Sequence, residues 1–265
     1  MNELSADLLR DIGAENAVGF ILVLARLSPL FLFAPLFSSR MLSARVRGIV
    51  LVALAVGIAP LALSGGDPPL DTLGIGELIV KELLIGLAFA FTIGLLVFAL
   101  QVAGGILDTL IGFSFGASVD PLTGNQGSAV LSQLYTLLGV LIFITINGDQ
   151  LVIRGIAETY ELVPMLAMPD LDQLVSGTLD AFVGLFTSAL QVAAPVILAL
   201  VLTDAAFGLV TKVVPQMNVF SVGVPAKVIV GILLITASLP FVGGYVSNEL
   251  ESSVRVALGS LGVSS

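Results

Sequence analysis

Aspartates in apolar surroundings are the side chains of this sequence that come nearest to suggesting an enzyme. Two facing carboxylates that share a proton can cleave a peptide bond, and Asp108 and Asp204 are the candidates for such a pair. Neither lies in a protease signature, and the sequence has no glycine-rich phosphate loop that ends in Lys-Ser or Lys-Thr. The chain also lacks cysteine and histidine, which excludes thiol nucleophiles, imidazole bases and the usual zinc or haem ligands. We therefore expect no enzyme activity, no metal and no cofactor.

A second group of charged residues lies in or beside apolar segments: Arg26, Lys81, Glu82, Asp204, Lys212 and Lys227. A charge at the centre of a membrane span costs about 2.5–3.5 kcal/mol on insertion scales, so each side chain needs a partner or water. Arg26 is the deepest, and we expect an acidic partner or a polar cavity beside it. Lys81 and Glu82 lie near an expected helix start, from which charged ends can reach the interface. The structural alternative is a set of buried ion pairs that fix helix register.

The composition indicates a membrane protein. It is 57% hydrophobic and 11% charged, whereas roughly a quarter of the residues in a soluble domain are charged. A helix needs about 20 apolar residues to cross a bilayer, and six segments meet or approach that length: 18–37, 48–63, 78–100, 129–146, 181–202 and 222–246. No polar linker divides the chain, so we predict one all-α membrane domain over residues 1–265, surrounded by lipid. Pro29 and Pro35 should bend the first segment and Pro195 the fifth, and Pro240 breaks the sixth.

Small residues recur at four-residue spacing in two of these segments. Gly86, Ala90 and Gly94 follow one another in the third segment, and Ala53 and Gly57 in the second. Because such stripes let helix backbones approach closely, we expect both of them to be packing faces.

The loop charges predict an orientation. Loop 38–47 carries three arginines and no acid, whereas loop 147–180 is acidic. Basic loops stay cytoplasmic, which places loop 38–47 inside, loop 147–180 outside and, by alternation, loop 101–128 inside. Loop 147–180 opens with an Asn-Gly-Asp turn signal, and its short apolar stretch at 151–157 has room for a short helix.

An irregular segment interrupts the apolar pattern between the third and fourth spans: Gly112-Phe113-Ser114-Phe115-Gly116-Ala117-Ser118-Val119-Asp120-Pro121. Proline disfavours the α conformation in the residue before it, so a helix should stop by Asp120. Gly112 and Gly116 flank two bulky aromatic side chains on a bendable backbone. Non-helical backbone at membrane depth is tolerated only where protein buries it or where it lines a cavity. We interpret the segment as a movable apolar plug, and an ordinary glycine-rich loop is the alternative.

Several motifs together resemble one protein family. They are Leu24-Ala25-Arg26-Leu27-Ser28-Pro29, Arg45-Val46-Arg47-Gly48, the irregular segment above, Phe143-Ile144-Thr145-Ile146-Asn147-Gly148, Ala194-Pro195-Val196 and Val214-Pro215-Gln216-Met217-Asn218-Val219-Phe220. Over roughly residues 18–246 the sequence resembles the FliR/SctT family of type III secretion export-gate proteins. Each motif alone is weak, but the combination is specific.

The resemblance implies a subunit of the flagellar type III export gate, a channel for unfolded flagellar proteins across the bacterial inner membrane. Members of the family join FliP and FliQ in a hetero-oligomeric helical assembly of bent hairpins, beside FlhA and FlhB in the basal body. Residues 1–125 would be a FliP-like portion with plug loop 110–123, and residues 126–265 a FliQ-like portion. The role of the plug then falls on Gly112 to Pro121, the charged residues would serve burial or assembly, and no nucleic acid is implied as a partner.

Two alternatives stay open at this point. Broken helices and midspan charges would also serve a self-contained secondary transporter. Such a transporter should work alone, whereas a gate subunit should need its partners. Injectisome proteins share the motifs, so an injectisome gate subunit is the alternative to a flagellar one.

Overall fold

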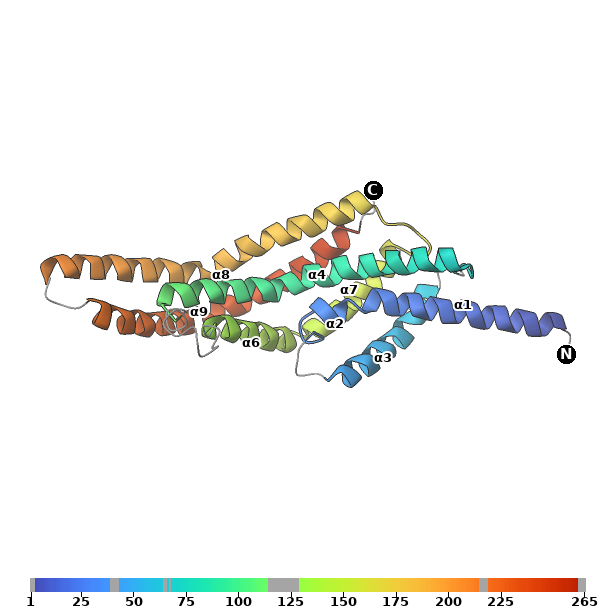
Figure 1. Cartoon of the computed structure of the whole chain (residues 1–265), viewed down its shortest axis with the longest axis horizontal. Helices are drawn as coiled ribbons and strands as arrows, with labels where there is room; N and C mark the ends of the chain where they lie inside the picture. The colour runs from blue at the N-terminus through green and yellow to red at the C-terminus, as the bar shows by residue number, and fades with distance from the viewer. Residues whose placement is uncertain are drawn as a thin grey trace, which may run out of the picture. The chain divides into compact units, whose positions relative to one another are not determined.

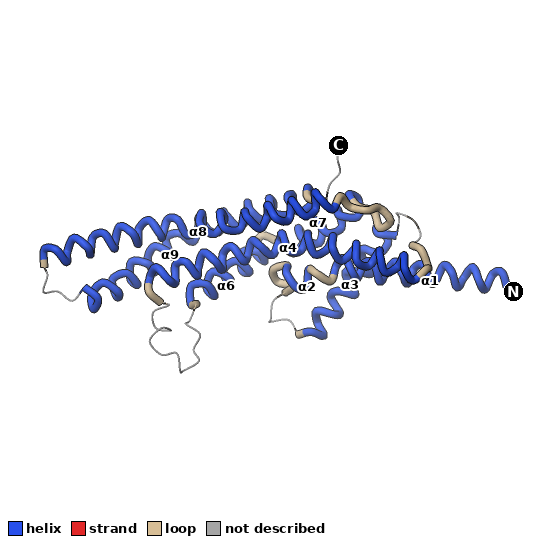
Figure 2. Tube along the Cα trace, turned by 45° about the horizontal axis from the view of Figure 1, so that its top comes forward, coloured by secondary structure: helices blue, strands red, loops and turns tan. Residues whose placement is uncertain are grey.

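The computed structural model describes residues 3–38, 43–63, 66, 68–113, 129–214 and 219–261, and no described residue forms a strand (Figures 1 and 2). The helices are α1 (Glu3–Leu27), α2 (Leu30–Phe33), α3 (Ala44–Leu63), α4 (Thr72–Ile111), α6 (Val130–Thr145), α7 (Gly148–Leu162), α8 (Leu171–Val213) and α9 (Val219–Gly259). Within the described ranges, five helical stretches are long and apolar enough to cross a membrane, or six if α6 and α7 form one broken span. The prediction of an all-α membrane protein is confirmed.

Proline affects these helices in two different ways. α1 ends at Leu27, Pro29 precedes the separate α2, and Ala34 is extended before Pro35, as expected for a residue that precedes proline. The helix of the first segment is therefore interrupted at Pro29 and ends before Pro35, the two positions where bends were predicted. The predicted break at Pro240 is wrong, because α9 continues through it. A long apolar helix tolerates one missing hydrogen bond when its neighbouring turns stay bonded.

Contacts between Cα atoms divide the chain into two compact units. Unit 1 consists of Met1–Leu95, Asn147–Phe182 and Leu250–Ser265, and unit 2 of Leu96–Ile146 and Val183–Glu249. Three helices, α4, α8 and α9, contribute residues to both units. The FliP-like and FliQ-like portions concern a resemblance to other proteins, and they stay a prediction.

Unit 1 is built around close contacts of the first half of α4. A Cβ on Gly86 would lie 2.0 Å from the Arg26 carbonyl oxygen, and one on Gly94 would lie 2.7 Å from that of Phe33. Ala90, between them, is buried, so the predicted packing face on this helix is confirmed. The second predicted stripe makes no such contact within the chain, because a Cβ on Gly57 would meet nothing within 4 Å.

The remaining elements of unit 1 close around this contact. α1 packs against α3, and α3 contacts α7. A buried apolar cluster joins residues of α4, the segment after α7, α8 and the C-terminal end: Ile85, Ala88, Val163, Leu174 and Leu261. The short helix expected at 151–157 is present as the longer α7, which follows a left-handed Asn147 with φ 56°.

Candidate functional site

Arg26 lies in the last turn of α1 and is completely buried. Two of its nitrogens bind the Glu82 carboxylate: Nε donates to Oε2, and Nη2 donates to Oε1 at 2.9 Å. Nη1 donates to the Thr159 hydroxyl at 3.1 Å, and Nη2 also donates to the Val163 carbonyl at 3.0 Å. The guanidinium carbon lies 3.8 Å from the centroid of the Tyr160 ring. The predicted acidic partner is confirmed, and the planar guanidinium binds it in the bidentate geometry that suits arginine.

Lys81 and Glu82 do not reach toward an interface, because their side chains are 4% and 0% exposed. Lys81 Nζ lies 3.0 Å from Glu82 Oε1. It also donates to the main-chain carbonyls of Met165 and Ala167, the latter at 3.1 Å. The expectation for these two residues is wrong because α4 begins at Thr72, which places them in about its third turn instead of at its start.

We call Arg26, Lys81 and Glu82 the buried charge cluster, and residues 163–170 the α7–α8 turn. The cluster joins α1, α4, α7 and the α7–α8 turn, whose carbonyls at Val163, Met165 and Ala167 accept hydrogen bonds from its two cations. Those carbonyl dipoles help to compensate the positive charge that Glu82 alone does not balance. Each charged group is engaged by another group, so the arrangement fixes helix packing and offers no free base or nucleophile. Among the described residues, no group of three or more His, Cys, Asp or Glu side chains could hold a metal ion.

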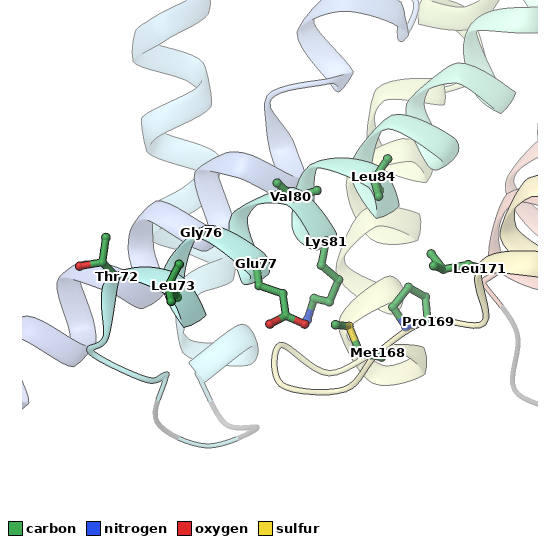
Figure 3. Close-up of a pocket in the computed structure, with 10 residues that line it drawn as sticks. All are labelled: Thr72, Leu73, Gly76, Glu77, Val80, Lys81, Leu84, Met168, Pro169 and Leu171. Carbon is green, nitrogen blue, oxygen red and sulfur yellow. The ribbon is translucent and has the colours of Figure 1, made fainter.

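An apolar pocket of about 670 Å³ opens beside the cluster, between the first turns of α4, the α7–α8 turn and the start of α8 (Figure 3). Lys81 lines it and extends toward the backbone that carries Met168 and Pro169. A second pocket of about 410 Å³ shares Leu84 with the first, and Thr178 is the one polar residue in its lining. Linings of this kind suit apolar side chains or lipid better than a polar substrate.

Asp204 and Lys212 belong to unit 2, in α8, whereas the three residues of the buried charge cluster belong to unit 1. Asp204 accepts a hydrogen bond from Lys227 of α9 at 2.9 Å, with its side chain 53% exposed. Lys212 is exposed in the last turn of α8.

Asp108 and Asp204, considered above as a catalytic pair, each bind other groups. Asp108 is 2% exposed. Its Oδ1 accepts the N–H of Leu131 at 2.9 Å, and its Oδ2 accepts the N–H of Ser132 at 3.0 Å. Asp108 is bound by main-chain donors and Asp204 by Lys227, so the two carboxylates do not form a proton-sharing pair.

Only the first two residues of the predicted plug are described. The helix before it ends at Ile111, and Gly112 follows with φ 99°, a conformation that favours glycine. The Gly112 N–H donates to the Asp108 carbonyl at 3.2 Å, and Phe113 is half-buried in the same turn. Residues 114–121 lie outside the described ranges, so the plug stays a prediction.

Two residues that contact the cluster, Thr159 and Tyr160, were not predicted from the sequence. Thr159 and Tyr160 are polar or amphipathic and lie in an acidic stretch, which masked their role. A signal was present: Val152 and Ile156 are buried with them on one face of α7, at the three- and four-residue spacing of an amphipathic helix.

Known proteins resemble this chain over most of its length. The family model of bacterial export proteins, family 1, matches residues 17–253. The flagellar biosynthetic protein FliR of Bacillus subtilis (strain 168) is 31% identical over 92% of this chain and 96% of its own length. FliR of Escherichia coli (strain K12) is 30% identical over 84% of each chain. The surface presentation of antigens protein SpaR of Salmonella typhimurium is 26% identical over 95% of this chain and 90% of its own length. This chain therefore belongs to the bacterial export proteins, family 1.

Proposed function

We propose that this chain is a subunit of the flagellar type III protein export gate in the bacterial inner membrane. There it helps to form the channel for unfolded flagellar proteins. The observation that carries the proposal is the family match over residues 17–253, together with similarity to FliR over nearly whole chains. The match takes in residues of both compact units, so it supports a common role for the chain as a whole.

Assembly with other subunits is supported by the chain's own surface. Only 17%, 33% and 22% of the most apolar stretches of α3, α8 and α9 are buried within the chain. Leu202, Val213 and Leu233 are 71%, 79% and 64% exposed. Lipid or partner helices must cover such surfaces. The proposed partners are FliP and FliQ in the gate, with FlhA and FlhB as neighbouring export proteins.

The segment from Gly112 to Pro121 is proposed as the plug of the closed channel. Its two phenylalanines are bulky and apolar, and constrictions of this kind exclude water and ions. The positive φ of Gly112 supports a sharp exit of the chain from α4 at this point.

Co-expression with FliP and FliQ, followed by native mass spectrometry in detergent, tests the gate assignment. The chain should be recovered in a hetero-oligomer and should aggregate or be degraded when it is expressed alone. A monodisperse, folded monomer obtained without partners would overturn the assignment in favour of a self-contained transporter.

Conductance of the purified complex in a planar bilayer tests the plug. Deletion of residues 112–118, or the change of both Phe113 and Phe115 to alanine, should leave the complex assembled but leaky to small ions. An assembled variant with unchanged closed-state conductance would rule the plug out. Restored swimming in a strain that lacks its own FliR would assign the flagellar branch, and restored injectisome secretion alone would assign the other.

A further inference from the structure

Asp108 supplies α6 with a helix cap that α6 cannot make for itself. The first N–H groups of a helix have no partner within the helix, and a side-chain oxygen at the N-cap position usually accepts one of them. The N-cap residue of α6 is Ala129, which has no side-chain oxygen and makes no capping hydrogen bond. The Asp108 carboxylate, from α4, accepts the N–H groups of Leu131 and Ser132 instead, at 2.9 and 3.0 Å. A negative charge at this position is also favoured by the helix dipole.

The same residue holds the end of its own helix. The Asp108 carbonyl accepts the N–H of Gly112 at 3.2 Å, in the turn where the chain leaves α4 with a positive φ. The main chain of Asp108 therefore contacts the last described turn before residues 114–128. Its side chain contacts the first helical turn after them.

Two further contacts keep α4 and α6 close enough for this bond. A Cβ on Gly104, one turn before Asp108, would lie 2.6 Å from the Leu131 carbonyl oxygen, so only glycine fits there. The Ser132 hydroxyl donates to the Gln101 carbonyl at 2.9 Å. All of these residues belong to unit 2. Gly104, Asp108, Leu131 and Ser132 are buried, and Asp108 is the charged residue among them.

We infer that Asp108 is a positioning residue, which ties the end of α4 to the start of α6 and so fixes the two points between which residues 112–129 run. The consequence of this role for the channel rests on the proposed plug: if that segment is a plug, Asp108 helps to fix the position of the plug. The tie itself does not depend on the plug.

The tie can be measured in the purified, partner-containing complex by hydrogen exchange at the start of α6. Asp108→Ala should speed exchange of the Leu131 and Ser132 amides about 10- to 100-fold, the range expected when a hydrogen bond to a charged group is lost. Asp108→Asn keeps one acceptor oxygen but turns its amide NH₂ toward the other main-chain N–H, so it should raise the exchange rate of the two amides by less. This variant keeps the test valid if the alanine variant does not fold. Thr109→Ala, an exposed change in the same turn of α4, is the matched control.

Capping and tying can be separated by a second change. Adding Ala129→Asp to Asp108→Ala restores a local cap with the same charge but no bond to α4. Spin labels on cysteines at Thr109 and Gln133, both exposed, then report the separation of the two helices, since the native chain has no cysteine. The double variant should recover slow exchange yet keep a broadened distance distribution and, if the plug is correct, a raised closed-state conductance.

Three outcomes overturn the inference. The first is an unchanged exchange rate in an assembled Asp108→Ala or Asp108→Asn complex. The second is an unchanged distance distribution in Asp108→Ala, and the third is full recovery of that distribution by Ala129→Asp. A broadened distribution with unchanged conductance would retain the tie and count against the plug alone, so the failures of the two proposals are distinguishable.

Discussion

Neutralising Glu82 should destabilise the protein more than removing its strongest partner. In Glu82→Gln, Arg26 and Lys81 stay buried and charged with no carboxylate between them, and the new amide NH₂ faces donors that need acceptors. In Arg26→Met, the Glu82 carboxylate loses both hydrogen bonds from Arg26 but keeps Lys81 at 3.0 Å. The contacts of Arg26 with Thr159, Val163 and the Tyr160 ring are also lost. The buried charge that each change leaves uncompensated therefore decides which of the two variants is destabilised more.

The magnitudes follow from the burial of the three groups. Breaking a fully buried ion pair by removing one partner costs about 3–5 kcal/mol, and we expect at least this for Glu82→Gln. Arg26→Met should cost about 1–3 kcal/mol, the range for leaving a buried acceptor unsatisfied. Asp204→Asn is the control, because its pair with Lys227 is half-exposed and such pairs contribute about 0–1 kcal/mol.

The assay is thermal unfolding of the detergent-solubilised complex, followed by size-exclusion chromatography of the heated samples at one fixed heating rate. For a chain of this size, about 2–4 °C of Tm corresponds to 1 kcal/mol, so Glu82→Gln should lower the Tm by roughly 6–20 °C. The reasoning is refuted if Glu82→Gln unfolds together with Asp204→Asn, or if Arg26→Met unfolds at a lower temperature than Glu82→Gln.

Three other changes have clear expected outcomes. Gly86→Ala should cost about 1–3 kcal/mol, because the new Cβ meets main-chain atoms that cannot turn aside, whereas Gly57→Ala should be nearly neutral in the same melting assay. A cysteine at Ser176 should react with an impermeant maleimide in intact spheroplasts and one at Ser43 should not; the reverse pattern would invert the predicted orientation. Lys81→Met should speed hydrogen exchange and proteolysis in the α7–α8 turn without unfolding α4, and unchanged exchange there would show that Lys81 does not hold the turn.

Helix positions could be predicted well from the sequence, and helix ends less well. Apolar runs of about 20 residues mark spans because lipid satisfies no backbone group, but a helix continues past its apolar run wherever protein covers it. α8 begins at Leu171 rather than at 181, and here a signal was present. Asp170 accepts the N–H groups of Asp172 and Gln173 at 3.1 and 3.2 Å, which is the geometry of an N-cap after Pro169.

The candidate site could be predicted only in part. Arg26 had to be paired because an isolated buried guanidinium is too costly, and its partner was therefore expected to be acidic. The identity of that partner depends on how α1 meets α4, across 56 positions of sequence, and no local pattern carries this information. The predicted start of α4 also led away from Glu82 as the partner, because it placed this residue where its carboxylate could reach the membrane interface.

The small-residue stripe and the buried charges were interpreted separately from the sequence, yet they form one contact. Gly86 stands one turn beyond Glu82, and residues four apart lie on the same face of a helix. Because Gly86 has no Cβ, the Arg26 backbone comes within 2.0 Å of where that atom would be, and this approach brings the guanidinium within reach of both Glu82 oxygens. A larger residue at 86 would push α1 away and lengthen the ion pair. Arg26 and Glu82 can therefore be buried as a pair in an apolar span because Gly86, one turn away, lets the backbones of α1 and α4 approach closely.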